Sequence, residues 1–267
     1  MFKYFLIALL FISQNAFSSS QCFIVKNLKD NKILKTEGQC EERTTPASTF
    51  KIPLGLMGFD SGIFTSATQP EWKYAEKHAE NAWGEPCKVP QSPASWIKNS
   101  CVWYSQELVA KLGKEKFQHY VDIFNYGNKD ITGDPGENNG LKRSWIGSSL
   151  KISPNEQIEF LSKLIQNQLP VSRQSQELIR EILFVEVLPE DWKLYGKTGM
   201  AFQKDKDGTR NSKRQFGWYV GWVSKGDDNL VFAYRIKDEE DQTEPAGLRA
   251  KKEGIQQLKD MLHTTTP

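Results

Sequence analysis

The sequence predicts an α+β fold: an antiparallel sheet built from both termini, flanked by helices, with a mostly helical region inserted. β-like runs occupy Cys22–Leu28 and Lys32–Thr36 and return after Trp192. Between them, apolar residues recur at the spacing of helices. Strands at both ends of a helical middle indicate one sheet with helices packed on it, and we expect a site in the cleft between sheet and helical region.

The first half of the chain supplies one strand pair and then helices. Lys29–Asn31 is a turn signal between the first two strands. A helix is expected to begin after Pro46 and to run past Leu56. Two further helical stretches are Glu107–Phe124 and Ser175–Phe184, and Ser153-Pro154-Asn155-Glu156 predicts a capped helix start between them.

The second half returns to strands and ends in a helix. The expected strands are Trp192–Gly199, Phe216–Ser224 and Leu230–Ile236, followed by a helix over Gly247–Leu262. The charged stretch Phe202–Phe216 is interpreted as a long loop between two strands. This loop is expected to shape substrate choice. We therefore expect one domain over residues 19–267, with its helical region at about 60–185.

Composition excludes several classes of protein. The apolar fraction is 38% and the charged fraction 25%, which excludes wholesale disorder. The 35 basic and 33 acidic residues give a net charge of +2, so no nucleic-acid partner is expected.

Residues 1–18 are interpreted as a secretory signal peptide. Lys3 precedes the apolar run Tyr4–Ile12, and Ala16 and Ser18 have the spacing of a cleavage site. A buried first helix is the alternative. The run is shorter than the roughly 20 apolar residues that span a bilayer. We expect secretion across an inner membrane into the periplasm, without stable membrane anchoring.

An oxidising compartment permits disulfides among the four cysteines, Cys22, Cys40, Cys87 and Cys101. Three complete pairings are possible. Cys22 and Cys40 flank the expected hairpin and are the best candidate pair. Cys101 lies in an apolar context and is interpreted as a buried free thiol.

Histidine chemistry has little support in this sequence. The three histidines, His78, His119 and His263, lie far apart and share no metal-ligand spacing, so neither a metal site nor a Ser-His-Asp triad is expected. A serine nucleophile can use a lysine as its base instead. Ser48-Thr-Phe-Lys51 has the form S-x-x-K, which places both side chains on one helical face.

The S-x-x-K pattern alone is weak, because it also occurs at Ser95–Lys98 and Ser148–Lys151. Apolar residues surround Lys51, and an apolar pocket lowers the pKa of an amine. Ser100-Cys101-Val102 and Lys197-Thr198-Gly199 follow in order, and each form occurs once. The glycine is expected to let a ligand approach its strand closely.

Taken together, these motifs make the chain similar to the penicillin-recognising serine enzymes, and within them to the class D, oxacillinase-type β-lactamases. The resemblance covers nearly all of the chain after the signal peptide. It includes the three motifs above, Tyr126-Gly127-Asn128, Trp145, Gly217-Trp218 and Arg249. The S-x-V and Y-G-N forms together separate class D from class A, in which S-D-N is expected.

The resemblance implies hydrolysis of the β-lactam amide bond through an acyl-enzyme on Ser48. It implies no cofactor beyond carbon dioxide, held covalently as an N-carboxyl group on Lys51, which then acts as the general base. The residue matching Trp145 would hydrogen-bond that group, and Val102 would cover it. Ser100 would relay a proton to the leaving nitrogen, with Lys197 orienting it.

The substrate carboxylate is expected to bind Thr198 and Arg249, beside Gly199, because an arginine fork suits a carboxylate. The backbone amides of Ser48 and Met200 would form the oxyanion hole. Tyr126-Gly127-Asn128 is expected to support the cleft, and Trp218 to lie in a strand near its wall.

A β-lactam sensor domain and a cell-wall peptidase of the same fold are the alternatives to a hydrolase. The N-terminal segment, interpreted as cleavable, favours the enzyme. The small-molecule β-lactam is the only partner expected, and the resemblance leaves its preferred type and the oligomeric state open.

Overall fold

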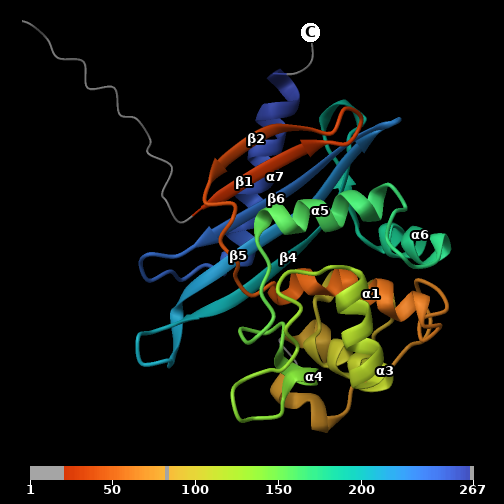
Figure 1. The fold of residues 1–267 in the computed structure, drawn as a ribbon, viewed down its shortest axis with the longest axis vertical. Helices are drawn as coiled ribbons and strands as arrows, with labels where there is room; N and C mark the ends of the chain where they lie inside the picture. Colours follow the sequence, from red (N-terminus) through yellow and green to blue (C-terminus); the bar gives the residue numbers. More distant parts are fainter. Residues whose placement is uncertain (1–20, 82–83, 265–267) are drawn as a thin grey trace, which may run out of the picture.

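The computed structural model describes residues 21–81 and 84–264, so the signal peptide expected over 1–18 lies outside the described residues. One antiparallel sheet has the strand order β2-β1-β6-β5-β4-β3 (Figure 1). Its strands are β1 (Cys22–Asn27), β2 (Lys32–Gly38), β3 (Phe184–Val187), β4 (Lys193–Lys204), β5 (Arg210–Lys225) and β6 (Asp228–Lys237). Because β1 pairs with β6, the two ends of the chain meet in the sheet centre, which confirms the predicted architecture.

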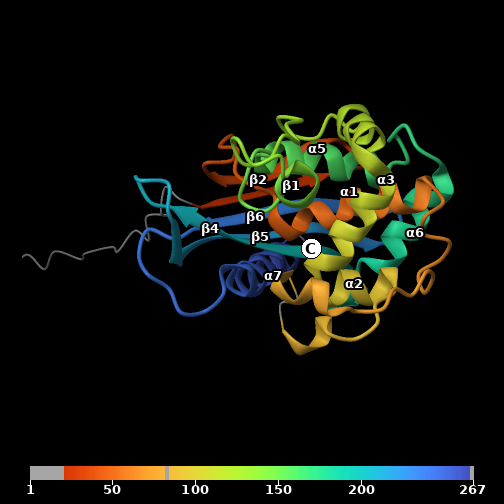
Figure 2. The same ribbon diagram turned by 90° about the horizontal axis from the view of Figure 1, so that it is seen from below.

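Helices cover both faces of the sheet (Figures 1 and 2). The C-terminal helix α7 packs on β4, β5 and β6, whereas α5 packs on β1, β5 and β6 from the other face. The α-helices are α1 (Lys51–Asp60), α2 (Pro93–Asn99), α3 (Val102–Ile123), α4 (Gly140–Arg143), α5 (Pro154–Ile165), α6 (Arg173–Ile182) and α7 (Ala246–Thr264). Short 3₁₀ turns are η1 (Ala47–Phe50), η2 (Glu76–Asn81), η3 (Glu85–Cys87) and η4 (Pro189–Asp191).

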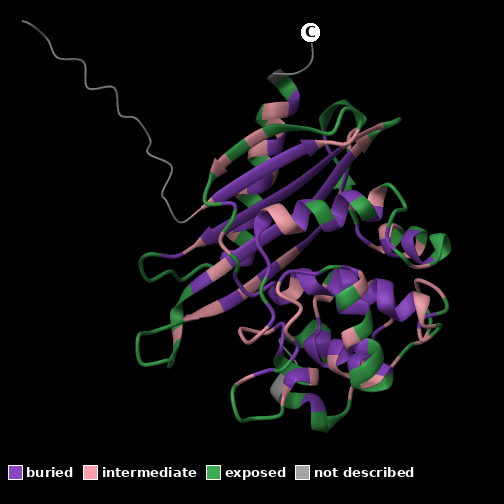
Figure 3. Cartoon of the chain, in the orientation of Figure 1, coloured by how far each residue is buried: buried purple, intermediate pink, exposed green. Residues whose placement is uncertain are grey.

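Two apolar cores lie on opposite faces of the sheet. The smaller one joins the sheet to α7, and the larger one joins its other face to α5 and the remaining helices. The central strands are accordingly buried along most of their length (Figure 3). The predicted capping box of α5 is present: Ser153 Oγ accepts from the amide of Glu156, and Glu156 Oε2 accepts from the amide of Ser153.

Three sequence expectations need correction at element boundaries. Residues 202–216 are not a long loop: β4 and β5 continue to Lys204 and Arg210, and a short turn joins them into a hairpin that extends beyond the sheet (Figure 1). Its charged side chains are solvated, so the strands lack the apolar alternation that predicts them. The helix α6 ends at Ile182, and Phe184 instead begins β3, an edge strand whose exposed residues give no strand pattern.

The third correction concerns α3, which begins at Val102 rather than near Glu107 and has a kink at Gly113 (φ 74°). The early start places the helix directly after Ser100 and Cys101. Among the described residues, no helix is both long and apolar enough to cross a bilayer.

All four cysteines are paired. The disulfide Cys22–Cys40 confirms the best candidate pair. The expectation of a free thiol at Cys101 is wrong, because Cys101 is joined to Cys87. A buried apolar context is common to free and paired cysteines. Cys101 is paired because the fold places η3, which carries Cys87, against the corner between α2 and α3.

The segment that leads into η1 is fastened to the sheet by two buried side chains. The guanidinium of Arg235 on β6 donates to the carbonyl oxygens of Gln39 and Glu42, and to Glu42 Oε2 at 2.9 Å. Trp218 on β5 donates its indole N–H to the carbonyl oxygen of Thr45 at 3.0 Å. Trp218 therefore lies in a strand, as expected, but in the core beneath this segment.

The Trp218–Thr45 hydrogen bond generates a stability prediction. Trp218→Phe removes the donor and leaves a buried carbonyl oxygen without it, so we expect a loss of about 1–3 kcal/mol in the free energy of unfolding. Denaturant titration measures this loss. The half-buried Trp192, whose indole has no acceptor among the described residues, supplies the control Trp192→Phe. Equal effects of the two substitutions would contradict the assignment.

Candidate active site

Ser48 and Lys51 lie at the junction of η1 and α1. Lys51 Nζ donates to Ser48 Oγ at 3.0 Å. In a 3₁₀ turn, side chains three residues apart are eclipsed, so the S-x-x-K spacing brings the amine to the hydroxyl. The turn is closed by the carbonyl oxygen of Pro46, which accepts from the amide and the hydroxyl of Thr49. The structure therefore brings together the first predicted pair.

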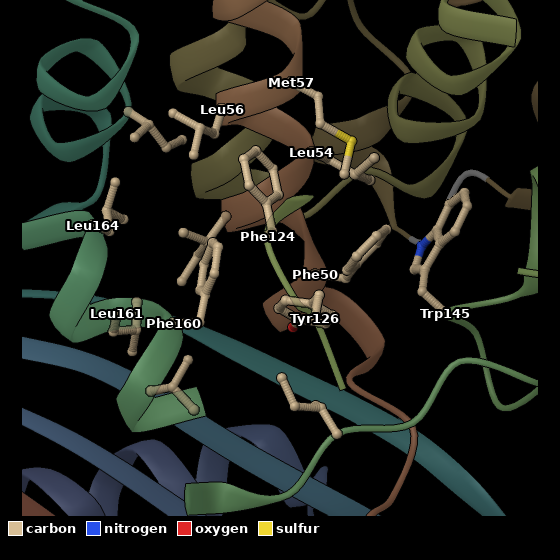
Figure 4. Packing of buried hydrophobic residues seen from close by; sticks show 14 of the residues in the cluster. Phe50, Leu54, Leu56, Met57, Phe124, Tyr126, Trp145, Phe160, Leu161 and Leu164 are labelled. Atoms are coloured by element: carbon tan, nitrogen blue, oxygen red, sulfur yellow. The ribbon is translucent and has the colours of Figure 1, made fainter. Parts of the chain in front are cut away.

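The Lys51 amine is fully buried, at 0% exposure. Burial lowers its pKa well below the ordinary value, and repulsion from Lys197 lowers it further. No carboxylate among residues 21–81 and 84–264 forms an ion pair with it. The adjacent core is aromatic: Phe50 stacks on Trp145 and contacts Tyr126 edge to face (Figure 4). Such surroundings favour the neutral amine.

Ser100 and Lys197 form the second pair, from different parts of the fold. Lys197 on β4 donates through Nζ to Ser100 Oγ at 3.0 Å and to the carbonyl oxygen of Thr198 at 3.2 Å. Burial lowers the pKa of Lys197 to about 7, and nearby Lys251 adds to the effect. At neutral pH this amine is therefore poised between its charged and neutral forms.

One cavity of about 240 Å³ joins both serines. Its lining includes the predicted residues Val102, Trp145, Thr198, Gly199 and Met200, together with Ala47, Asn99, Ile146, Pro245, Gly247 and Leu248. The sequence did not predict these last six residues, because none of them carries an acid, a base or a nucleophile. Leu248 is 56% exposed, which places an apolar side chain at the cavity rim.

Gly199 lets the turn that carries Ser48 approach β4 closely. A Cβ at this position would lie 2.9 Å from the carbonyl oxygen of Pro46 and 3.0 Å from Thr49 Cγ2. The absence of a side chain therefore allows the turn that carries Ser48 to pack against the strand that carries Lys197. Gly199 also lines the cavity, so the close approach of a ligand to its strand stays a prediction.

Trp145 is almost fully buried yet borders the cavity. Among the described residues, its indole N–H has no acceptor, so it is available to a group inside the cavity. Thr45 holds the Trp145 backbone in place: its Oγ1 donates to the carbonyl oxygen of Trp145 at 2.9 Å and accepts from the amide of Gly147.

The residues Tyr126, Gly127 and Asn128 connect the aromatic core to the segment after Trp145. Asn128 Oδ1 accepts from the amide of Lys151 at 2.9 Å, and its Nδ2 donates to the carbonyl oxygen of Ser149 at 2.8 Å. Gly127 has φ 56° and lies against the backbone of Lys151, where a Cβ would clash. These contacts support the cavity wall from behind.

The structure does not bring Arg249 into the cavity lining. Its Nη2 lies 2.8 Å from both carboxylate oxygens of Asp238, a buried residue at the end of β6. No local pattern in the sequence marks this partner, because the contact depends on how α7 returns to the sheet. No cluster of three potential metal ligands occurs among the residues that the structure describes.

Comparisons with known proteins agree with this geometry. The model of the penicillin binding protein transpeptidase domain matches residues 21–259. The chain is 36% identical to β-lactamase OXA-9 of Klebsiella pneumoniae over 92% of its length and 90% of that protein. It is 37% identical to β-lactamase OXA-1 of Escherichia coli over 88% of its length and 82% of that protein.

Solved structures extend the likeness to the whole fold. The crystal structure of OXA-427, a class D β-lactamase, is 37% identical and superposes with a TM-score of 0.84, over 92% of this chain and all of that one. FUS-1 (OXA-85), a class D β-lactamase from Fusobacterium nucleatum, gives 29% identity and a TM-score of 0.77, over 92% of this chain and 93% of that one. With its two serine–lysine pairs facing one cavity, this chain belongs to the class D serine β-lactamases.

Proposed function

We propose that the chain hydrolyses penicillin-type β-lactams, with Ser48 as the nucleophile. The observation that carries the proposal is the 3.0 Å contact between Ser48 Oγ and a fully buried amine that has no carboxylate partner in the described chain. A buried neutral amine, or a base built on it, takes the hydroxyl proton as the oxygen attacks the lactam carbonyl. The amides of Ser48 and Met200, at the cavity, would receive the oxyanion.

Lys51 is proposed to carry carbon dioxide as an N-carboxyl group. Three observations support the fit. The amine is buried and its pKa is lowered. Trp145 borders the cavity, and its indole N–H has no hydrogen-bond acceptor among the described residues. Only the neutral amine has the free electron pair that bonds to carbon dioxide, and a proton leaves the nitrogen in that reaction. When bound, this group would supply a carboxylate base for acylation and deacylation.

Ser100 is proposed to pass a proton to the lactam nitrogen as the ring opens. Its hydroxyl can accept from Lys197 and donate into the cavity, because Lys197 Nζ lies at 3.0 Å from its Oγ. Thr198 and Arg249 are proposed to bind the substrate carboxylate. For Arg249 this requires the guanidinium to bind the substrate carboxylate while it remains paired with Asp238.

A periplasmic location is supported by the two disulfides, Cys22–Cys40 and Cys87–Cys101. Disulfides persist in oxidising compartments and are rare in reducing ones. The proposal is therefore that the enzyme acts after export, where it meets β-lactams from outside the cell.

The first prediction tests the nucleophile. Ser48→Ala should reduce turnover of benzylpenicillin at least about 1,000-fold while leaving the fold intact, because no other hydroxyl replaces the attacking oxygen. Steady-state hydrolysis and circular dichroism measure the two effects. Ser148→Ala, in another S-x-x-K match, is the control. Parent-like turnover by Ser48→Ala would exclude this nucleophile, and one stoichiometric burst by the parent would indicate a sensor or peptidase.

The second prediction tests Lys51. Lys51→Ala should accumulate an acyl-enzyme on Ser48, because the base for deacylation is missing; intact-protein mass spectrometry after brief and long exposure to benzylpenicillin would show it. Lys151→Ala, an exposed lysine in the matching motif, should deacylate as the parent does. Parent enzyme inactivated by acid should regain activity on addition of bicarbonate. Failure of bicarbonate to act would favour a free-amine base.

The third prediction concerns pH and stability. The pKa of Lys197 is about 7 in the fold, against about 10.4 in an unfolded chain. Between these values the unfolded chain binds more protons, so the free energy of unfolding rises with pH. Lys197→Met should lower that slope by up to about 1.4 kcal/mol per pH unit between about pH 7.5 and 9.5. Urea titrations at several pH values measure it.

Lys193→Met is the control for this measurement, since Lys193 is exposed on the same strand. It should leave the slope unchanged. Equal slopes for the parent and Lys197→Met would show that Lys197 titrates as an ordinary lysine.

A further inference from the structure

Ser100 occupies a backbone conformation that its own residue type disfavours. It has φ 62° and ψ 33°, in the left-handed region, and forms the corner between α2 and α3. A non-glycine residue stays in that region only where the surrounding structure holds it. The orientation of Ser100 Oγ toward Lys197 therefore depends on what fixes this corner.

The next residue, Cys101, fixes the corner covalently. It is fully buried and bonded to Cys87, the last residue of η3. Both neighbours of Cys101 in the chain, Ser100 and Val102, line the cavity. The bond therefore fastens the backbone between two cavity residues to a segment that contributes no residue to the cavity lining.

Hydrogen bonds around the disulfide connect the same two parts of the chain. Trp103 donates its indole N–H to the carbonyl oxygen of Cys87 at 2.8 Å. On the other side of the corner, Asn99 Nδ2 donates to Gln91 Oε1 at 3.1 Å, and Gln91 Nε2 donates to the carbonyl oxygen of Pro86 at 2.8 Å. Residues 84–91 thus hold the corner from both sides, and the disulfide adds a covalent cross-link to these hydrogen bonds.

We propose that the Cys87–Cys101 disulfide is a positioning element for the reaction: it holds Ser100 where its hydroxyl meets Lys197 and the leaving nitrogen. This inference rests on the proposed role of Ser100 in acylation. Without the covalent bond, the corner can relax toward right-handed backbone angles, which turns Ser100 Oγ away from Lys197. Small displacements of a reacting group are sufficient to slow catalysis strongly.

The second disulfide provides an internal comparison. Cys22–Cys40 joins β1 to the segment after β2, and none of the residues adjacent to either cysteine in the sequence lines the cavity. Both bonds close short loops and both are buried. Either disulfide can therefore stabilise the fold, but only Cys87–Cys101 is placed to position a residue of the cavity.

The expected kinetic effect is confined to one step. Ser48 and Lys51 lie on η1 and α1, and neither belongs to the corner. Loss of the Cys87–Cys101 bond should therefore slow acylation, in which Ser100 supplies the proton, and leave deacylation close to its parent rate. In a reducing compartment, the same chain should acylate slowly.

The test compares Cys87→Ala with Cys40→Ala, each of which leaves the partner cysteine as a thiol. Rapid quench with benzylpenicillin and intact-protein mass spectrometry gives the acylation rate constant, the deacylation rate constant and the fraction of enzyme acylated. We expect Cys87→Ala to lower the acylation constant about 10- to 100-fold, with the deacylation constant and the acylated fraction near those of the parent. Cys40→Ala should change the acylation constant less than twofold.

A purely structural role predicts a different result. It lowers the acylated fraction or the melting temperature, but leaves the acylation constant of the folded molecules unchanged, and that outcome would overturn the proposal. An equal loss in Cys40→Ala would overturn it as well. If Cys87→Ala does not fold, reduction of the folded parent, checked by circular dichroism and thiol counting, should slow acylation, and reoxidation should restore it. A reduced parent with an unchanged acylation constant is equally decisive against the proposal.

A double-mutant comparison separates this inference from the proposed function. If the bond acts through Ser100, then Cys87→Ala should have no further effect on acylation in a Ser100→Ala background. Additive losses would show that the bond acts elsewhere. If Ser100→Ala alone acylates at the parent rate, the role assigned to Ser100 is refuted. If only Ser48→Ala loses all acylation, the assignment of Ser48 as the nucleophile still holds.

Discussion

The site depends on the burial of two lysine amines, each in contact with a serine that lines one cavity. Lys51 is 0% exposed and Lys197 is 5% exposed, and among residues 21–81 and 84–264 neither has a carboxylate partner. An unpaired ammonium is costly in such a place, so burial shifts both pKa values downward. The same cost makes the site reactive, because a neutral amine can accept a proton or bond to carbon dioxide. Stability and reactivity are therefore opposed at these two positions.

The rest of the fold keeps water away from those amines. The turn η1 lies directly on β4, because Gly199 has no side chain to separate them. Phe50, Tyr126 and Trp145 form the apolar side of the site, and Arg235 and Trp218 fasten the segment that leads into Ser48. Sheet and helical region are both required, since β4 supplies Lys197 whereas η1, α1 and the α2–α3 corner supply Ser48, Lys51 and Ser100. The cavity lies between the sheet and the helical region.

The two pairs are held by different means. Ser48 and Lys51 are neighbours in one continuous turn and helix, so local backbone geometry sets their distance. Ser100 and Lys197 are 97 residues apart, and their contact depends on how the α2–α3 corner packs against β4. That corner is held in a left-handed conformation and is tied to η3 by a disulfide. The second pair is therefore more sensitive to changes elsewhere in the molecule than the first.

The sequence alone predicted the fold class and the capped start of α5, and it offered Ser48–Lys51 and Cys22–Cys40 as the best candidates among several matches. Each of these rests on local spacing: periodicity, caps and residues three apart report on neighbours along the chain. The motif resemblance added Ser100, Lys197 and Trp145, which are far apart in sequence. Only the tertiary structure decided that Cys101 is paired, that Gly199 lets η1 pack on β4, and that Arg249 contacts Asp238. Those contacts join segments that are far apart in the sequence. They depend on how the sheet and helices pack, which local sequence patterns do not show.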